Sequence, residues 1–204
     1  MQSPSSKEYG IVLLAAGKSS RLGTPKQLLH FDGSTLVRKV AIQALEVSDK
    51  VIVVVGPKSE ELKESLNTLP LHLVNNTLFE EGIASSIRMG ITALVKTFGQ
   101  LSGVILIVCD QPYVLAPVLL NLVETAQKTN KGVVASAYSG TLGIPVLFHK
   151  NYFDKLLELK GDTGAKNLFN EYPEDVATID FPLGEVDIDT LEDYEAALKM
   201  QNLP

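Results

Sequence analysis

The chain contains two uninterrupted runs of aliphatic, mostly β-branched residues, at residues 51–55 (VIVVV) and 104–108 (VILIV). Such runs are typical of strands covered on both faces of a parallel sheet. Segments of helical periodicity accompany them at residues 36–45, 60–66, 85–95 and 118–126. Weaker strand signals occur at residues 71–74, 132–137 and 144–148. This alternation predicts an α/β protein with a mainly parallel, twisted sheet, right-handed crossovers and helices on both faces.

Length and composition fit one such domain. The chain has 204 residues, and no apolar run approaches the length of a membrane span. Residues 1–8 are polar and rich in serine, without an apolar signal-peptide region, so we expect a disordered leader before a single domain over residues 9–204. A single cysteine excludes an internal disulfide and fits a reducing cytoplasm.

The net charge of −6 argues against broad nucleic-acid binding, which requires a basic face. If the substrate is a polyanion, the positive charge must be local or must be supplied by a metal.

The first strand signal leads into a loop rich in glycine, hydroxyl groups and cations, at residues 10–26 (GIVLLAAGKSSRLGTPK). Glycine lets backbone N–H groups surround an anion, Ala15 and Ala16 leave space for a ligand, and Arg21 and Lys26 add charge-assisted contacts. We therefore predict a phosphate-binding loop, with an ordinary surface turn as the alternative. The spacing matches neither the P-loop of NTPases nor the dinucleotide fingerprint, because Ala15 replaces the first glycine of the latter.

In parallel sheets, ligands bind beyond the carboxyl ends of the strands. Asp110 follows the run at 104–108 in the sequence CDQP, and the next helix signal begins only near Ala116. Helix capping by Asp110 would therefore be indirect, and we favour metal binding. Cys109 is interpreted as a buried apolar residue at the strand end.

Two further segments have less specific signals. Residues 75–88 (NNTLFEEGIASSIR) could point the N–H groups and hydroxyls of a helix start at a phosphate or a base. A serine N-cap with a solvated Arg88 explains the same pattern equally well. Residues 161–166 (GDTGAK) predict a turn into a helix that begins near Thr163, with Asp162 as a plausible N-cap.

Residues 186–194 (VDIDTLEDY) alternate acidic and apolar residues before a last helix. The pattern predicts a short edge strand followed by a capping box from Thr190 to Asp193. Alternation would place Asp187 and Asp189 on one face, where their carboxylates could converge on one cation. The three histidines share no zinc-ligand spacing, and no Ser-His-Asp or Cys-His arrangement is evident.

Together these segments resemble the nucleotidyltransferases that mature the molybdenum cofactor, most closely the molybdenum cofactor cytidylyltransferases. The resemblance extends from Leu13 to Tyr194. Residues 13–26 resemble the family's signature loop, and residues 76–88 its second block. The remaining blocks follow in the family's order at residues 109–112 (CDQP), 143–145 (GIP), 161–166 (GDTGAK) and 187–190 (DIDT).

The resemblance implies a three-layer, Rossmann-like nucleotidyltransferase fold similar to glycosyltransferase A. It implies transfer of CMP from CTP, or of a nucleotidyl group from another NTP, to the phosphate of molybdopterin, with release of pyrophosphate. Mg²⁺ would be the cofactor and a molybdoenzyme a possible partner, in the cytoplasm and without nucleic acid or membrane. A phosphomonoester is already anionic near neutral pH, so this reaction needs no histidine base.

The resemblance also implies roles for individual residues. The catalytic group is Lys26, Arg21 and Asp110. The metal ligands are Asp110 and Asp189, with Asp187 left open in place of Asp189. The nucleotide-binding residues are Leu13, Ala15, Ala16, Gly17, Ser19, Arg21, Lys26, Asn76, Gly82 and Ser85. The acceptor-side residues are Arg88, Gln111, Pro145, Asp162 and Lys166.

Some positions depart from the family pattern or bear on the choice of substrate. Ala16 favours cytosine, because relatives that use GTP usually carry glycine there. Ile144, Lys166 and Thr77 replace a histidine, an arginine and a proline on the acceptor side. A sugar phosphate or methylerythritol phosphate therefore stays open as the acceptor. A non-catalytic protein that delivers molybdenum cofactor is a further alternative.

Overall fold

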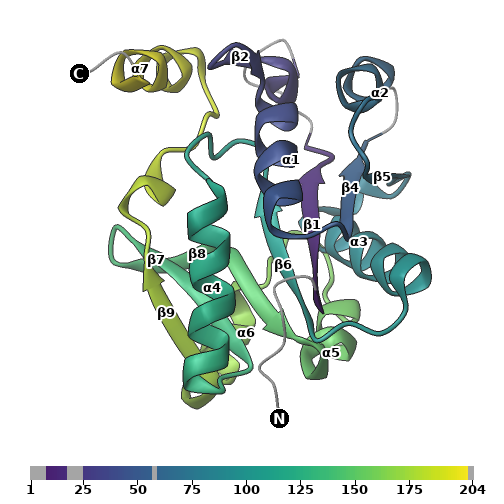
Figure 1. Ribbon diagram of the computed structural model, residues 1–204, viewed down its shortest axis with the longest axis vertical. Helices are drawn as coiled ribbons and strands as arrows, with labels where there is room; N and C mark the ends of the chain where they lie inside the picture. The colour runs from purple at the N-terminus through teal and green to yellow at the C-terminus, as the bar shows by residue number, and fades with distance from the viewer. Residues whose placement is uncertain (1–7, 18–24, 57–58, 202–204) are drawn as a thin grey trace.

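The computed structural model describes residues 8–17, 25–56 and 59–201. Within these residues the chain forms a seven-stranded sheet with the order β5-β4-β1-β6-β8-β7-β9 (Figure 1). β5, β4, β1 and β6 are parallel, β8 runs antiparallel to β6 and β7, and β9 is parallel to β7. The strands are β1 (Tyr9–Ala15), β4 (Val51–Val55), β5 (His72–Asn75), β6 (Gly103–Val108), β7 (Val133–Tyr138), β8 (Thr141–His149) and β9 (Val176–Asp180).

Helices cover both faces of this sheet. The helices are α1 (Leu36–Val47), α2 (Glu60–Leu66), α3 (Ile83–Phe98), α4 (Ala116–Thr129), α5 (Phe153–Leu157), α6 (Lys166–Glu171) and α7 (Leu191–Gln201). On one face α1, α2 and α4 pack in a common core, and Figure 1 shows α1 beside α4 in front of the sheet. On the other face α3, α5 and α6 form a second core. The predicted three-layer α/β fold is thereby confirmed.

β1 shows why these strands read as continuous apolar runs. Ile11, Leu13 and Ala15 belong to the core under α1 and α4, while Val12 and Leu14 belong to the core under α3. Both sides of the strand are thus buried, and polar side chains are excluded until the strand ends.

Short elements complete the chain. The hairpin of β2 (His30–Phe31) and β3 (Ser34–Thr35) packs with α7 in a third small core that includes Phe31 and Ala197 (Figure 1). No helix in the described part of the chain is both long and apolar enough to cross a membrane. The 3-10 turns are η2 (Lys26–Leu28), η3 (Phe79–Glu81), η4 (Lys150–Tyr152), η5 (Pro173–Asp175) and η6 (Pro182–Glu185).

Two local predictions are wrong. Residues 186–189 form no strand, because they leave the 3-10 turn at Pro182–Glu185 and make no ladder of backbone bonds with β6. A single backbone bond, from Ile188 N–H to Asp110 O (3.0 Å), connects this segment to the end of β6. Asp162 is not an N-cap, because α6 begins only at Lys166 and Ala165 occupies the cap position.

The capping box before α7 is confirmed. Asp193 Oδ2 accepts from Thr190 N–H (2.8 Å), and Thr190 Oγ1 accepts from Asp193 N–H (3.2 Å). The proposed leader lies outside the described residues except for Glu8.

Gly90 permits the close approach of α3 to β1. A Cβ at this position would lie 2.3 Å from Val12 Cγ1 and 3.2 Å from Val54 Cγ2. Alanine is the better helix former by about 1 kcal/mol, but overpacking in a core costs about 1–3 kcal/mol. We therefore expect Gly90→Ala to lower the free energy of unfolding, as measured by urea denaturation.

A double-mutant cycle with Val12→Ala provides the control. Removing the Val12 methyl groups should relieve most of the Gly90→Ala clash, so the two losses should be markedly less than additive. Strictly additive losses would show that the contact is not the cause.

Candidate active site

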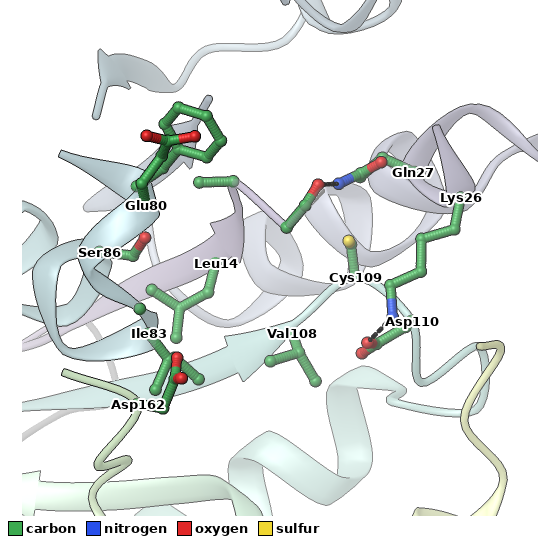
Figure 2. A pocket seen from close by; sticks show the side chains of 14 residues that line it. Leu14, Lys26, Gln27, Glu80, Ile83, Ser86, Val108, Cys109, Asp110 and Asp162 are labelled. Atoms are coloured by element: carbon green, nitrogen blue, oxygen red, sulfur yellow. Dashed lines mark hydrogen bonds and ion pairs between the residues drawn. The ribbon is translucent and has the colours of Figure 1, made fainter. Parts of the chain in front are cut away.

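A cavity of about 430 Å³ opens beyond the carboxyl ends of β1 and β6. Figure 2 shows Lys26 and Asp110 at one end, Asp162 at the other, and Leu14 and Val108 between them. The carboxyl ends of the central strands β1 and β6 therefore supply an apolar floor, and the loops beyond them supply the polar groups.

Three charged side chains from distant parts of the sequence meet at one point. Lys26 Nζ lies 2.6 Å from Asp110 Oδ2 and 2.6 Å from Asp189 Oδ1. Asp110 follows β6 directly, and the bond from Ile188 N–H to Asp110 O holds the segment carrying Asp189 beside it. We call these three residues the Lys-Asp-Asp cluster.

The charges of the cluster shift the pKa values of Lys26 and of the neighbouring Asp187. Burial alone would lower the pKa of Lys26, but Asp110 and Asp189 outweigh it and raise that pKa above its usual value. Partial burial, together with Asp189 and Asp110, raises the pKa of Asp187. Burial also raises the pKa of the Cys109 thiol, which keeps it neutral, in agreement with its interpretation as a buried apolar residue.

Asp110 and Asp189 fit the protein part of a magnesium site. The described residues contain no group of three or more His, Cys, Asp or Glu side chains that could hold a metal. However, Mg²⁺ commonly binds one or two carboxylates and completes its shell with substrate phosphates and water. The two carboxylates already converge on one cation, the Lys26 ammonium, so their placement meets this requirement.

The start of the first loop is held by a buried glutamine that the sequence analysis missed. Gln27 is only 3% exposed, and its Nε2 donates to Ala15 O (3.2 Å) and Gly17 O (2.9 Å). Ala16 and Gly17 line the cavity, as their predicted role requires. Ala15 lines an adjoining cavity of about 370 Å³.

The remaining residues predicted to bind nucleotide from the first loop do not line the cavity or are not described by the structure. Leu13 is fully buried in the core, and its neighbour Leu14 contacts the cavity instead. The reason is the alternation of β1, which turns the two side chains to opposite faces. Ser19 and Arg21 lie outside the described residues.

Asn76 and Ser85 of the second block form hydrogen bonds with other groups of the protein. Asn76 is fully buried, and its Nδ2 donates to Ser85 Oγ (2.8 Å) and Ser86 Oγ (3.0 Å). Asn76 Oδ1 accepts from Leu78 N–H, and Ser85 Oγ donates to Gly82 O. Asn76 and Ser85 thus shape the turn, while Gly82 and Ser86 line the cavity.

Gly82 lets this turn meet the loop that carries Asp162. Its φ is +113°, and a Cβ there would lie 2.3 Å from Asp162 Oδ1 and 2.5 Å from Gly161 O. Ala84 N–H also donates to Gly161 O (3.2 Å). The close contact brings Asp162 to the edge of the cavity.

Arg88 does not line this cavity, contrary to its predicted place on the acceptor side. Its guanidinium makes two bonds to the Glu81 carboxylate (2.8 and 2.6 Å) and one to Leu159 O (2.6 Å). Arg88 instead borders a separate cavity of about 490 Å³, where its guanidinium holds Glu81 and Leu159 together.

A third cavity, of about 510 Å³, adjoins the main one and shares Ile83, Val108, Asp110 and Asp162 with it. Three residues predicted for the acceptor border it: Gln111, Asp162 and Lys166. Pro145, after a cis peptide bond, is absent from the lining, although Ile144 and Val146 on either side contribute to it.

Tyr138 and Asp187 also line this third cavity, and the sequence analysis gave neither a role there. Tyr138 ends β7 beside the two-residue turn Ser139-Gly140 that joins it to β8, a local hairpin signal that the sequence analysis did not use. Gln27 had a weak signal, because it directly follows Lys26 in the loop.

The sheet is mainly parallel, with a glycine loop beyond β1 and an acidic group beyond β6, and a solved nucleotidyltransferase from Methanothermobacter shares this fold. The chain belongs to the family of the MobA-like NTP transferase domain, whose model matches residues 11–176. The protein is accordingly an enzyme of the nucleotidyltransferase type.

Two characterised relatives align with most of the chain. Molybdenum cofactor cytidylyltransferase of Escherichia coli is 23% identical over 190 residues, which cover 91% of this chain and 93% of that protein. Purine catabolism protein PucB of Bacillus subtilis is 28% identical over 197 residues, which cover 90% and 93%.

Solved structures agree with the fold. A homologue of Mycobacterium tuberculosis Rv0371c from Mycobacterium sp. strain JC1 superposes with a TM-score of 0.80 at 29% identity, covering 97% of this chain and 98% of that one. Rv0371c in complex with manganese has a TM-score of 0.73 at 24% identity, covering 94% and 98%.

The contact at Gly82 can be tested by substitution. We expect Gly82→Ala to lower the melting temperature more than Gly99→Ala, because both residues have positive φ but only Gly82 faces a clash. At Gly99, with φ +71°, no described atom lies within 4 Å of the added Cβ, so only the backbone cost of that conformation, about 1–3 kcal/mol, is expected. Equal losses for the two variants would refute the contact.

Proposed function

We propose that this enzyme transfers CMP from CTP to the terminal phosphate of molybdopterin and releases pyrophosphate. The observation that carries this proposal is the Lys-Asp-Asp cluster at the point where two cavities meet, with Asp110 on the wall of both. The likeness to the E. coli cytidylyltransferase over most of both chains supports this choice of donor and acceptor.

We assign the two substrates to different cavities. The main cavity, bordered by Ala16 and Gly17, suits the nucleotide, and the third cavity, bordered by Gln111 and Lys166, suits the acceptor. The reacting phosphorus would then lie near Asp110. An anionic phosphomonoester attacks without a general base, so the protein must mainly align the reactants and neutralise charge.

Charge neutralisation is assigned to cations. Mg²⁺ held by Asp110 and Asp189 would stabilise negative charge on the phosphate oxygens. Rv0371c has been solved in complex with manganese, and this likeness supports the use of a divalent metal here. Lys26, and Arg21 by resemblance, would contact the triphosphate and its leaving pyrophosphate.

A cluster that combines a lysine with two carboxylates argues against a protein that only carries the cofactor. A protein that only carries the cofactor requires groups that bind it. It does not require charged side chains at the point where a nucleotide cavity and an acceptor cavity meet. A direct assay distinguishes molybdopterin from a sugar phosphate or methylerythritol phosphate as the acceptor. The proposal also includes a cytoplasmic location and a molybdoenzyme that receives the product.

Pyrophosphate release tests the proposal. With CTP and Mg²⁺, we expect turnover with molybdopterin and little with N-acetylglucosamine 1-phosphate or methylerythritol phosphate. Asp110→Ala and Lys26→Ala should each lower kcat by about 100-fold or more, because each removes charge at the reacting phosphates.

Asp180→Ala serves as the matched control, since Asp180 is exposed at the end of β9 and borders neither cavity. Activity of the Asp110 and Lys26 variants within a few-fold of wild type would refute their roles. Turnover with a sugar phosphate but not with molybdopterin would refute the acceptor.

The choice of base is assigned to Ala16, which lines both the main cavity and the adjoining one that Ala15 borders. We expect Ala16→Gly to enlarge this space and to shift the ratio of kcat/KM for CTP over GTP toward GTP by about tenfold. The ratio is measured with a common acceptor. An unchanged ratio would remove Ala16 from base selection.

A further inference from the structure

The Lys26 side chain fills the position that a metal would need. Its ammonium is within hydrogen-bond distance of one oxygen of Asp110 and one of Asp189, and the Lys26 side chain is only 12% exposed. A divalent cation shared by these carboxylates would lie close to the ammonium, and like charges at short range repel strongly in a partly buried site.

The backbone that carries Lys26 is fixed. Leu28 N–H donates to Pro25 O (2.9 Å), which closes the 3-10 turn η2 (Lys26–Leu28). The next residue, Gln27, is buried and bonded to Ala15 O and Gly17 O. Rotation of its own four-carbon side chain is enough to move the Lys26 ammonium away from the carboxylates.

A ligand in the main cavity would give the Lys26 ammonium a second set of anionic partners. Lys26 lines the same cavity as Ala16 and Gly17, where the proposed function places the triphosphate. Phosphate oxygens accept strong charge-assisted bonds from an ammonium. A bound triphosphate can therefore take over the Lys26 ammonium that the two carboxylates otherwise share.

We propose that Lys26 keeps the metal site closed in the nucleotide-free protein, and that the triphosphate opens it by drawing the ammonium onto its phosphates. The metal then enters with the nucleotide or after it, not before. This inference rests on the proposed function only in taking a nucleoside triphosphate as the ligand of the main cavity. It makes Lys26 a positioning residue for metal binding as well as a phosphate contact.

Binding of Mn²⁺ to the purified protein without nucleotide tests the inference. Followed by isothermal titration calorimetry or by electron paramagnetic resonance of free Mn²⁺, binding should be at least about tenfold tighter in Lys26→Met than in wild type, because the variant leaves two uncompensated carboxylates. Lys26→Arg keeps the cation and should bind Mn²⁺ as weakly as wild type.

Two controls separate this effect from a general change of charge. Lys39→Met removes a lysine that pairs with Asp32 (2.7 Å) instead of the cluster, and it should leave Mn²⁺ affinity unchanged. Asp110→Asn in the Lys26→Met background should abolish the gain. Equal affinity of wild type and Lys26→Met would overturn the inference.

The wild-type protein supplies a second measurement that does not depend on the folding of a variant. Mn²⁺ alone should leave its melting temperature within about 1 °C, whereas Mn²⁺ with CTP should raise it by several degrees through binding to the native state. A rise of several degrees with Mn²⁺ alone would overturn the inference. Absence of pyrophosphate release with every acceptor would refute the proposed function, yet it would leave the Mn²⁺ comparison intact.

Discussion

Burial of β1 and β6 on both faces is the constraint on which this structure depends. Neither strand can carry a charged side chain along its length, because each side packs into a helix-covered core. Polar groups are therefore confined to the loops that follow the strands. Since the two strands are parallel neighbours, those loops open at the same edge of the sheet and face one another across one cavity.

The Lys-Asp-Asp cluster gives this edge its chemistry, and the proposed divalent metal would let it bind polyanions, because one lysine beside two carboxylates leaves a net negative charge. The net charge of −6 is spread over the chain, but Lys26 concentrates positive charge beside two carboxylates that suit a metal. The raised pKa of Lys26 keeps its ammonium charged throughout the neutral range. Local placement of charge, more than the overall balance, decides which ligand the cavity suits.

The loops around the cavity are held in place by buried or paired side chains that do not themselves have to contact a ligand. Asn76 fixes the turn before α3, Gln27 fixes the start of the first loop, and Arg88 clamps Glu81 to Leu159. The family resemblance implied substrate contacts for Asn76 and Arg88, whereas the local pattern alone was explained equally well by helix capping and a solvated Arg88. Burial and pairing are properties of the folded chain, so a local pattern cannot distinguish such supporting residues from ligand contacts.

The sequence by itself determined most of the strands and helices, although not β9, α5 or the hairpin of β2 and β3. It also determined the three-layer fold, the capping box before α7, and the strand ends near which Asp110 and the first loop lie. These features follow from periodicity and from composition over a few consecutive residues, and the order of the motifs carried the family. The tertiary structure decided the absence of a strand at residues 186–189, because that segment meets the end of β6 through a single backbone bond. It also decided that Lys26 meets Asp110 and Asp189, which lie 84 and 163 residues further along the chain. Contacts over such separations depend on how the loops pack at one edge of the sheet, and no local pattern encodes that packing.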